Sequence, residues 1–98
     1  MKKSILEKET PELWKDYISL AEKASSDGAL SAKVKELMMV ALSIALRCES
    51  CLMVHLKRAQ KLGATRQEIA ETLGVTLLMN GGPADVWSRE IIAEALEL

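Results

Sequence analysis

Phenylalanine is absent from this sequence, and the aromatic side chains are limited to Trp14, Tyr17 and Trp87. The hydrophobic residues, 49% of the chain, are therefore almost all aliphatic, and so must be any core that they build. Blocks of basic residues are absent too, because 13 Lys and Arg are interspersed with 14 Asp and Glu for a formal net charge of -1. This pattern does not suit a phosphate backbone, and we expect no nucleic-acid partner.

Long apolar runs are also missing. No stretch approaches the roughly 20 apolar residues of a membrane-spanning helix, and the first residues lack the apolar segment of a signal peptide. We therefore expect a soluble, cytoplasmic protein with no membrane partner. In that compartment two close cysteines are more often catalytic or metal-binding than structural. The length of 98 residues fits a single domain over residues 1–98.

What the sequence does have is apolar residues at helical spacing, divided by turn residues into about five helices. These are expected over about residues 11–24, 31–47, 48–62, 65–79 and 83–98. The hydroxyl of Thr10 is expected to cap the first of them. From Leu37 to Leu46 only Ser43 is polar, which predicts that the middle of the second helix is buried on all sides. No alternating strand pattern competes, so the predicted fold class is all-α.

Both cysteines and the only histidine lie within eight residues, from Cys48 to His55. On a helix at about 100° per residue, the two sulfurs and the imidazole share one narrow stripe. A C-x-x-C pair can close an internal disulfide, and a helix N-terminus or an imidazole favours its reactive thiolate. The stretch therefore predicts a redox dithiol with a proton acceptor beside it.

Several motifs resemble the AhpD-like alkylhydroperoxidase branch of the carboxymuconolactone decarboxylase family over about residues 30–85. They are Lys35-Glu36-Leu37, the C-x-x-C-x-x-x-H of residues 48–55, Leu62-Gly63-Ala64 and Gly81-Gly82-Pro83. The resemblance implies a compact helical bundle that assembles into homo-oligomers and reduces hydroperoxides. We expect no cofactor and no metal ion. The resemblance further implies a lipoyl or thioredoxin-like reducing partner.

The resemblance also implies a role for each site residue. Cys51 would attack the peroxide and Cys48 would resolve the oxidised sulfur, while Glu36 and His55 would form a proton relay. The fuller family pattern has a second histidine where this sequence has Ser50, whose hydroxyl does not titrate near neutral pH. Full-length AhpD proteins also contain a second copy of the helical unit, which this sequence lacks.

Three functions of different classes stay open. The first is a thiol peroxidase, the second is a dithiol-disulfide oxidoreductase that handles no peroxide, and the third is a zinc-binding or structural module with Cys48, Cys51 and His55 as ligands. Zinc normally takes four protein ligands, or three and a water, and Glu36 could be the fourth here, but one helix rarely wraps three ligands around a tetrahedral ion.

Two further expectations concern spatial arrangement. In a plain antiparallel hairpin that turns at Cys48, Glu36 would face a point roughly 8 Å along the axis from His55. Contact between them therefore requires crossed helices or a neighbouring subunit. Self-association is expected because a short chain leaves much of its apolar helix faces uncovered, and the helix with Trp87 and Ile91 is the first candidate for that contact.

Overall fold

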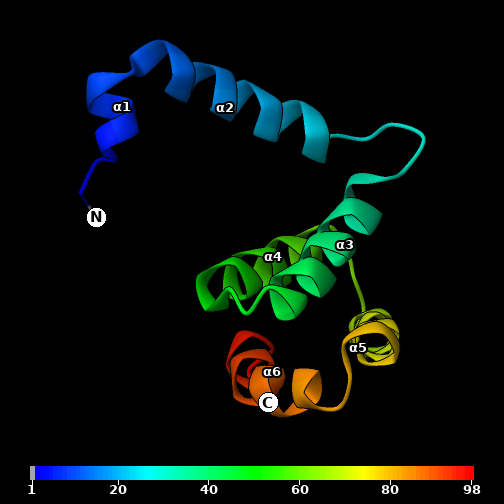
Figure 1. Cartoon of the computed structure of the whole chain (residues 1–98). Coiled ribbons are helices and arrows are strands. Elements are labelled where there is room, and N and C mark those ends of the chain that lie inside the picture. The colour runs from blue at the N-terminus through cyan, green and yellow to red at the C-terminus, as the bar shows by residue number, and fades with distance from the viewer. Residues whose placement is uncertain (1) are drawn as a thin grey trace.

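The computed structural model describes residues 2–98, and this range contains six helices and no strand (Figure 1). The helices are α1 (Ile5–Glu9), α2 (Pro11–Ser25), α3 (Ala32–Ala45), α4 (Glu49–Lys61), α5 (Arg66–Asn80) and α6 (Pro83–Ala95). The predicted all-α class is confirmed, and the short α1 is additional to the predicted helices. The expected cap at Thr10 is wrong, because its hydroxyl donates to the carbonyl of Leu6, 2.7 Å away, and closes α1 instead.

Side-chain caps explain where three of the longer helices begin. Ser31 accepts a hydrogen bond from the backbone N–H of Val34 at the start of α3. Thr65 and Glu68 form a reciprocal capping box at the start of α5, as the sequence Thr-x-x-Glu predicts. Cys48 caps α4 through its sulfur. Each cap satisfies a backbone donor that a helix start otherwise leaves unpaired.

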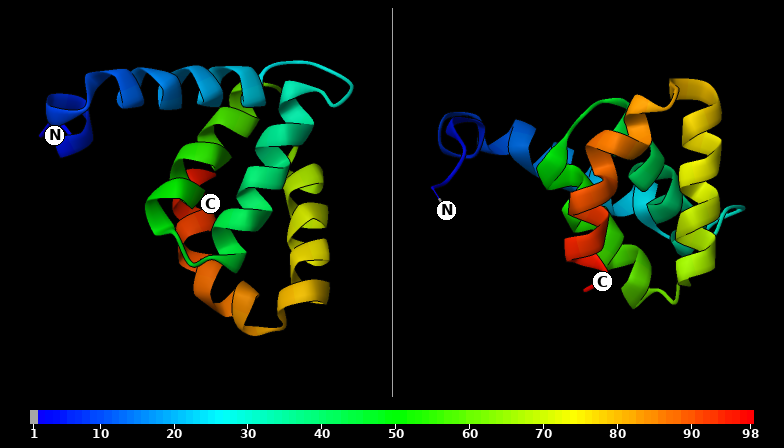
Figure 2. Two further views of the ribbon diagram at one scale, coloured as in Figure 1. Left: turned by 45° about the horizontal axis from the view of Figure 1, so that its top comes forward. Right: turned by 90° about the horizontal axis from the view of Figure 1, so that it is seen from below.

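The helices α3 to α6 pack around one aliphatic core, as the lack of phenylalanine predicts. In this bundle α3 pairs with α4, α5 lies against α3, and α6 contacts α3, α4 and α5 (Figure 2). The core residues are Val40, Ile44, Leu52, Leu56, Ile69, Ala84, Ile91 and Ala95. Ile91 belongs to this core, and Trp87 packs against it. These two side chains are therefore largely used within the chain and offer little surface for the expected contact between copies.

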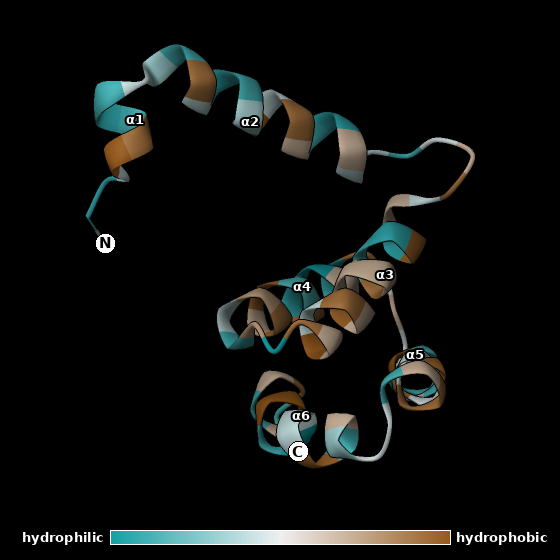
Figure 3. Ribbon diagram, in the orientation of Figure 1, coloured by the Kyte–Doolittle hydropathy of each residue, from teal (hydrophilic) through white to brown (hydrophobic). Residues whose placement is uncertain are grey.

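The helices α1 and α2 form an arm, residues 5–25, that extends past the bundle (Figures 1 and 2). Neither helix has a buried residue. Apolar bands nevertheless recur along the arm (Figure 3), and Leu13 and Leu20 are 56% and 63% exposed. The position of the arm also overturns one prediction. The middle of α3 is not buried on all sides, because Met38 and Leu42 are exposed along its length.

None of the helices within residues 2–98 is long and apolar enough to cross a membrane.

Candidate functional site

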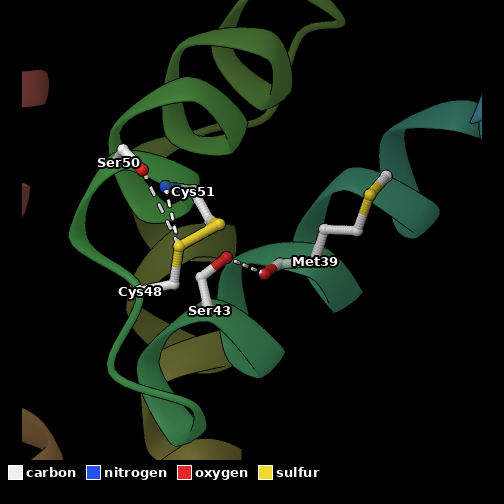
Figure 4. Close-up of a disulfide and its surroundings, with 5 residues drawn as sticks. All are labelled: Met39, Ser43, Cys48, Ser50 and Cys51. Atoms are coloured by element: carbon white, nitrogen blue, oxygen red, sulfur yellow. Dashed lines mark hydrogen bonds between the residues drawn. A yellow bond between two sulfur atoms is a disulfide. The ribbon is translucent and has the colours of Figure 1, made fainter. Parts of the chain in front are cut away.

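The two cysteines form a disulfide at the beginning of α4, with their Cα atoms 5.3 Å apart (Figure 4). Cys48 is the N-cap residue, and its sulfur accepts a hydrogen bond from the backbone N–H of Cys51 at 3.3 Å. The hydroxyl of Ser50 lies 3.8 Å from the same sulfur. The positive end of a helix and a backbone donor therefore face Cys48, and both stabilise negative charge on its sulfur.

The turn that carries Cys48 is anchored to the rest of the bundle. Arg47, just before it, adopts a left-handed backbone conformation with φ 57°. Its guanidinium donates to the side-chain oxygen of Asn80 at 2.9 Å and lies 5.4 Å from the ring centroid of Trp87. The N–H of Cys48 donates to the carbonyl of Ser43 at 2.9 Å. Nothing in the motif spacing singled out Arg47, which here joins the dithiol turn to α5 and α6.

Glu36 on α3 and His55 on α4 meet within one chain, with Oε2 of the carboxylate 2.6 Å from Nδ1 of the imidazole. The side chain of Glu36 is only 5% exposed and that of His55 is 19% exposed. The contact forms across the non-helical turn that joins the two helices, so no neighbouring subunit is needed for it. Because Nδ1 is held by the carboxylate, the other ring nitrogen is left to exchange protons.

The last turns of α3 form one wall of the dithiol. Ser43 is almost fully buried, and its hydroxyl donates to the carbonyl of Met39 at 2.6 Å. Figure 4 shows Ser43 next to the cysteine pair, with its hydroxyl turned toward the Met39 carbonyl one turn earlier on the same helix. The thiol site is therefore built from the end of α3 and the beginning of α4.

The structure brings Cys48 and Cys51 together and pairs Glu36 with His55. Within residues 2–98 no hydrogen bond joins His55 to either sulfur, although the imidazole follows Cys51 by one helical turn. A disulfide sulfur has no proton to pass to the imidazole, so proton transfer between them requires the reduced site. The described part of the chain holds no group of three His, Cys, Asp or Glu side chains arranged to bind a metal ion.

Comparison with known proteins gives consistent results. The sequence model of the carboxymuconolactone decarboxylase family matches residues 11–94. An uncharacterized protein of Cupriavidus necator is 39% identical over 70 residues, which cover 71% of this chain and 62% of that protein. The matched part of this chain thus spans less than two thirds of the relative's length. An uncharacterized protein from the cox locus of Paracoccus denitrificans is 31% identical over 77 residues, which cover 79% of this chain and 69% of that protein.

Two solved structures are similar over most of the chain. A carboxymuconolactone decarboxylase family protein of Legionella pneumophila is 44% identical with a TM-score of 0.84, covering 94% of this chain and 81% of that one. A family protein of Thermotoga maritima is 31% identical with a TM-score of 0.79, covering 88% and 89% of the two chains. The Thermotoga protein is described as a candidate for a role in an antioxidative response.

Proposed function

The chain belongs to the carboxymuconolactone decarboxylase family, and from that membership we propose that it is a thiol-dependent hydroperoxide reductase with Cys48 and Cys51 as its dithiol. The observation that carries the proposal is the Glu36–His55 pair one turn beyond Cys51. A buried carboxylate that orients an imidazole is the arrangement of a proton relay. Here it stands beside two sulfurs that can be oxidised together.

The first step oxidises Cys51 and reduces the peroxide. The Cys51 thiolate attacks the distal oxygen of the hydroperoxide, the O–O bond breaks, and Cys51 becomes a sulfenic acid. The departing alkoxide takes a proton that His55 supplies while Glu36 stabilises the imidazolium. One alcohol is formed, and two electrons pass from sulfur to oxygen.

The second step closes the disulfide. The Cys48 thiolate attacks the sulfenic sulfur of Cys51, the S–S bond forms, and the departing hydroxide becomes water by taking a proton. The product is the Cys48–Cys51 disulfide described above. Cys48, held at the N-cap by the Cys51 amide, is already positioned for this attack.

The cycle is completed by a dithiol partner of lipoyl or thioredoxin-like type, in the cytoplasm. A partner thiolate attacks the Cys51 sulfur, and Cys48 leaves as a thiolate that the N-cap stabilises. The second partner thiol then releases Cys51, so the partner ends as a disulfide and the protein as a dithiol.

One observation favours a second candidate, a dithiol-disulfide oxidoreductase that uses no peroxide. A sulfur that serves as a helix N-cap is a good leaving group in exchange with partner proteins. That chemistry needs neither the buried carboxylate nor the imidazole, which is why we place it second.

In the deciding experiment, the reduced protein is treated with one equivalent of an organic hydroperoxide, and the metal content of the same sample is measured. We expect stoichiometric conversion to the alcohol and a mass loss of about 2 Da, the two hydrogen atoms lost on disulfide formation. Reduced protein that leaves the peroxide intact but exchanges with partner disulfides would replace the peroxidase by the second candidate. One zinc bound per chain would instead support the metal-binding module.

A further inference from the structure

A groove of about 470 Å³ lies between the arm and the bundle, and the relay histidine borders it. Its walls are mostly apolar: α2 contributes Tyr17 and Ala21, and α3 contributes Met38, Met39 and Leu42. The volume falls within the range of about 300–1,000 Å³ typical of small-molecule sites.

Two cations also line this groove, Lys35 from α3 and Arg58 from α4. The Lys35 ammonium donates to the carbonyl of Ser26 at 2.7 Å, which fixes it beside the loop that follows α2. Arg58 is exposed, and within residues 2–98 it makes no ion pair. No aspartate or glutamate is among the residues that line the groove. An apolar wall therefore ends in two cations. The Glu36 carboxylate, which lines a second pocket together with Arg58, is held by His55.

The groove also borders the Glu36–His55 pair, although neither cysteine lines it. Its lining includes His55, which follows Cys51 by one helical turn, and Met39, whose carbonyl accepts from Ser43 beside the disulfide (Figure 4). A molecule lying along Met38, Met39 and Leu42 would thus lie against His55, one helical turn from Cys51.

We propose that this groove binds an amphipathic organic anion, with its hydrocarbon chain along α3 and its carboxylate on Arg58 and Lys35. The proposal rests on the proposed function in that the natural ligand would be the carboxylate-bearing hydroperoxide that the dithiol reduces. Charge complementarity and the apolar lining identify this class: a neutral alkyl peroxide would leave the two cations unused, and a small polar peroxide would leave the apolar wall unused.

The test uses decanoate as the probe, because it has the chain and the carboxylate but no peroxide. Calorimetry on the full-length oxidised protein should show binding of decanoate, weaker binding of decanol and none of decyltrimethylammonium. Arg58→Gln should weaken decanoate binding by about three- to tenfold, as expected for loss of one partly exposed charged contact. The same substitution should leave decanol binding unchanged.

The matched control is Lys57→Gln, which removes one positive charge from the neighbouring position of α4 outside this groove. It should leave decanoate binding unchanged. Leu42→Asp, on the apolar wall, should weaken the binding of both decanoate and decanol. Equal effects of Lys57→Gln and Arg58→Gln would reduce the site to general electrostatics and overturn the proposal.

A kinetic arm separates this proposal from the function on which it rests. With a fatty-acid hydroperoxide, Arg58→Gln should raise KM about three- to tenfold at unchanged kcat, and with tert-butyl hydroperoxide it should change neither constant. Decanoate binding without any peroxide consumption would overturn the proposed peroxidase function and support the anion-binding groove. Peroxide consumption without decanoate binding would overturn the anion-binding groove and support the peroxidase function. This holds also if a second copy of the chain covers the groove.

Discussion

The carboxylate of Glu36 lies 2.6 Å from Nδ1 of His55 and is almost completely buried, so the two residues form a unit that spans α3 and α4. Glu36→Gln keeps the shape of the side chain and an oxygen that can accept from Nδ1, but it removes the charge that stabilises an imidazolium. We expect peroxide-dependent thiol oxidation to fall by about 10²–10⁴-fold, with little change in melting temperature. Stopped-flow oxidation kinetics and calorimetry on the same sample measure both quantities.

The control for this substitution is Glu71→Gln, which removes a carboxylate from the exposed face of α5. His55→Ala is a poorer test, because it leaves the buried Glu36 carboxylate without a partner and should destabilise the fold. If Glu36→Gln oxidises at the wild-type rate and melts at a much lower temperature, the pair is structural.

The two cysteines should differ in role. Cys51→Ser should abolish peroxide consumption, whereas Cys48→Ser should allow one attack and leave sulfenic or sulfinic acid on Cys51. Intact-mass analysis after one equivalent of peroxide distinguishes these products. The N-cap position of Cys48 gives the test a real alternative, since a helix terminus favours its thiolate. Oxidation of Cys51→Ser but not of Cys48→Ser would reverse the assignment.

A pH dependence of stability follows from the capping box of α5. The Lys33 ammonium, 2.9 Å from Glu68, and the Thr65 N–H hold the pKa of Glu68 below its ordinary value of 4.5. A lowered pKa means that the ionised group stabilises the fold at any pH above 4.5 and that this contribution is lost as the pH falls through the lower, folded-state value. Glu68→Gln should therefore lower the melting temperature at pH 7, and this difference from wild type should shrink in acid as the pH falls through the lowered, folded-state pKa of Glu68.

The exposed carboxylate of Glu94 on α6 provides the comparison, and Glu94→Gln should leave the melting temperature unchanged both at pH 7 and in acid. A difference between Glu68→Gln and wild type that persists in acid would show that the hydrogen bonds of the box matter and the charge does not.

Gly74 offers a gain in stability. A Cβ added there meets no atom within 4 Å, and the residue lies inside α5 with no left-handed backbone angle. Gly74→Ala should raise the free energy of unfolding by about 0.5–1 kcal/mol, because alanine loses less backbone entropy on entering a helix. At Gly63 the same change should cost about 1 kcal/mol or more, because φ is +92° there. Urea denaturation measures both. A loss at Gly74 would mean that another chain packs on this part of α5.

The arm is the surface that we expect to mediate self-association. Leu13 and Leu20 repeat at seven residues on α2 and are more than half exposed, and two copies of a chain with net charge -1 repel only weakly. Replacing both with Glu should convert an oligomer to a monomer in light scattering at micromolar concentration. Leu78→Glu, on α5 and 83% exposed, is the matched control and should leave the mass unchanged. A monomeric wild type would remove the expectation.

Features that depend on neighbouring residues, such as helix starts, could be predicted from the sequence. Features that depend on how the helices pack in space could not. The capping box at Thr65 and the cap at Ser31 depend on residues within one turn, so the sequence predicted where α5 and α3 begin. The pairing of Glu36 with His55 depends on how the turn between α3 and α4 sets the two helices against each other, which no periodicity encodes. The prediction that the middle of α3 is buried on all sides was wrong. An apolar residue such as Leu42 indicates a surface that favours burial, but the pattern does not show whether α2, a ligand or a second chain buries it.

The sulfur of Cys48 accepts a hydrogen bond from the Cys51 amide. The strength of this hydrogen bond should therefore depend on whether the site is oxidised or reduced. A thiolate is a stronger acceptor than a disulfide sulfur, since charged acceptors form stronger hydrogen bonds. The Cys51 amide should therefore resonate at different frequencies in the reduced and oxidised proteins and exchange its hydrogen more slowly in the reduced one. A single ¹⁵N nucleus at the start of α4 could then follow turnover in real time, with no dye attached and no coupled enzyme.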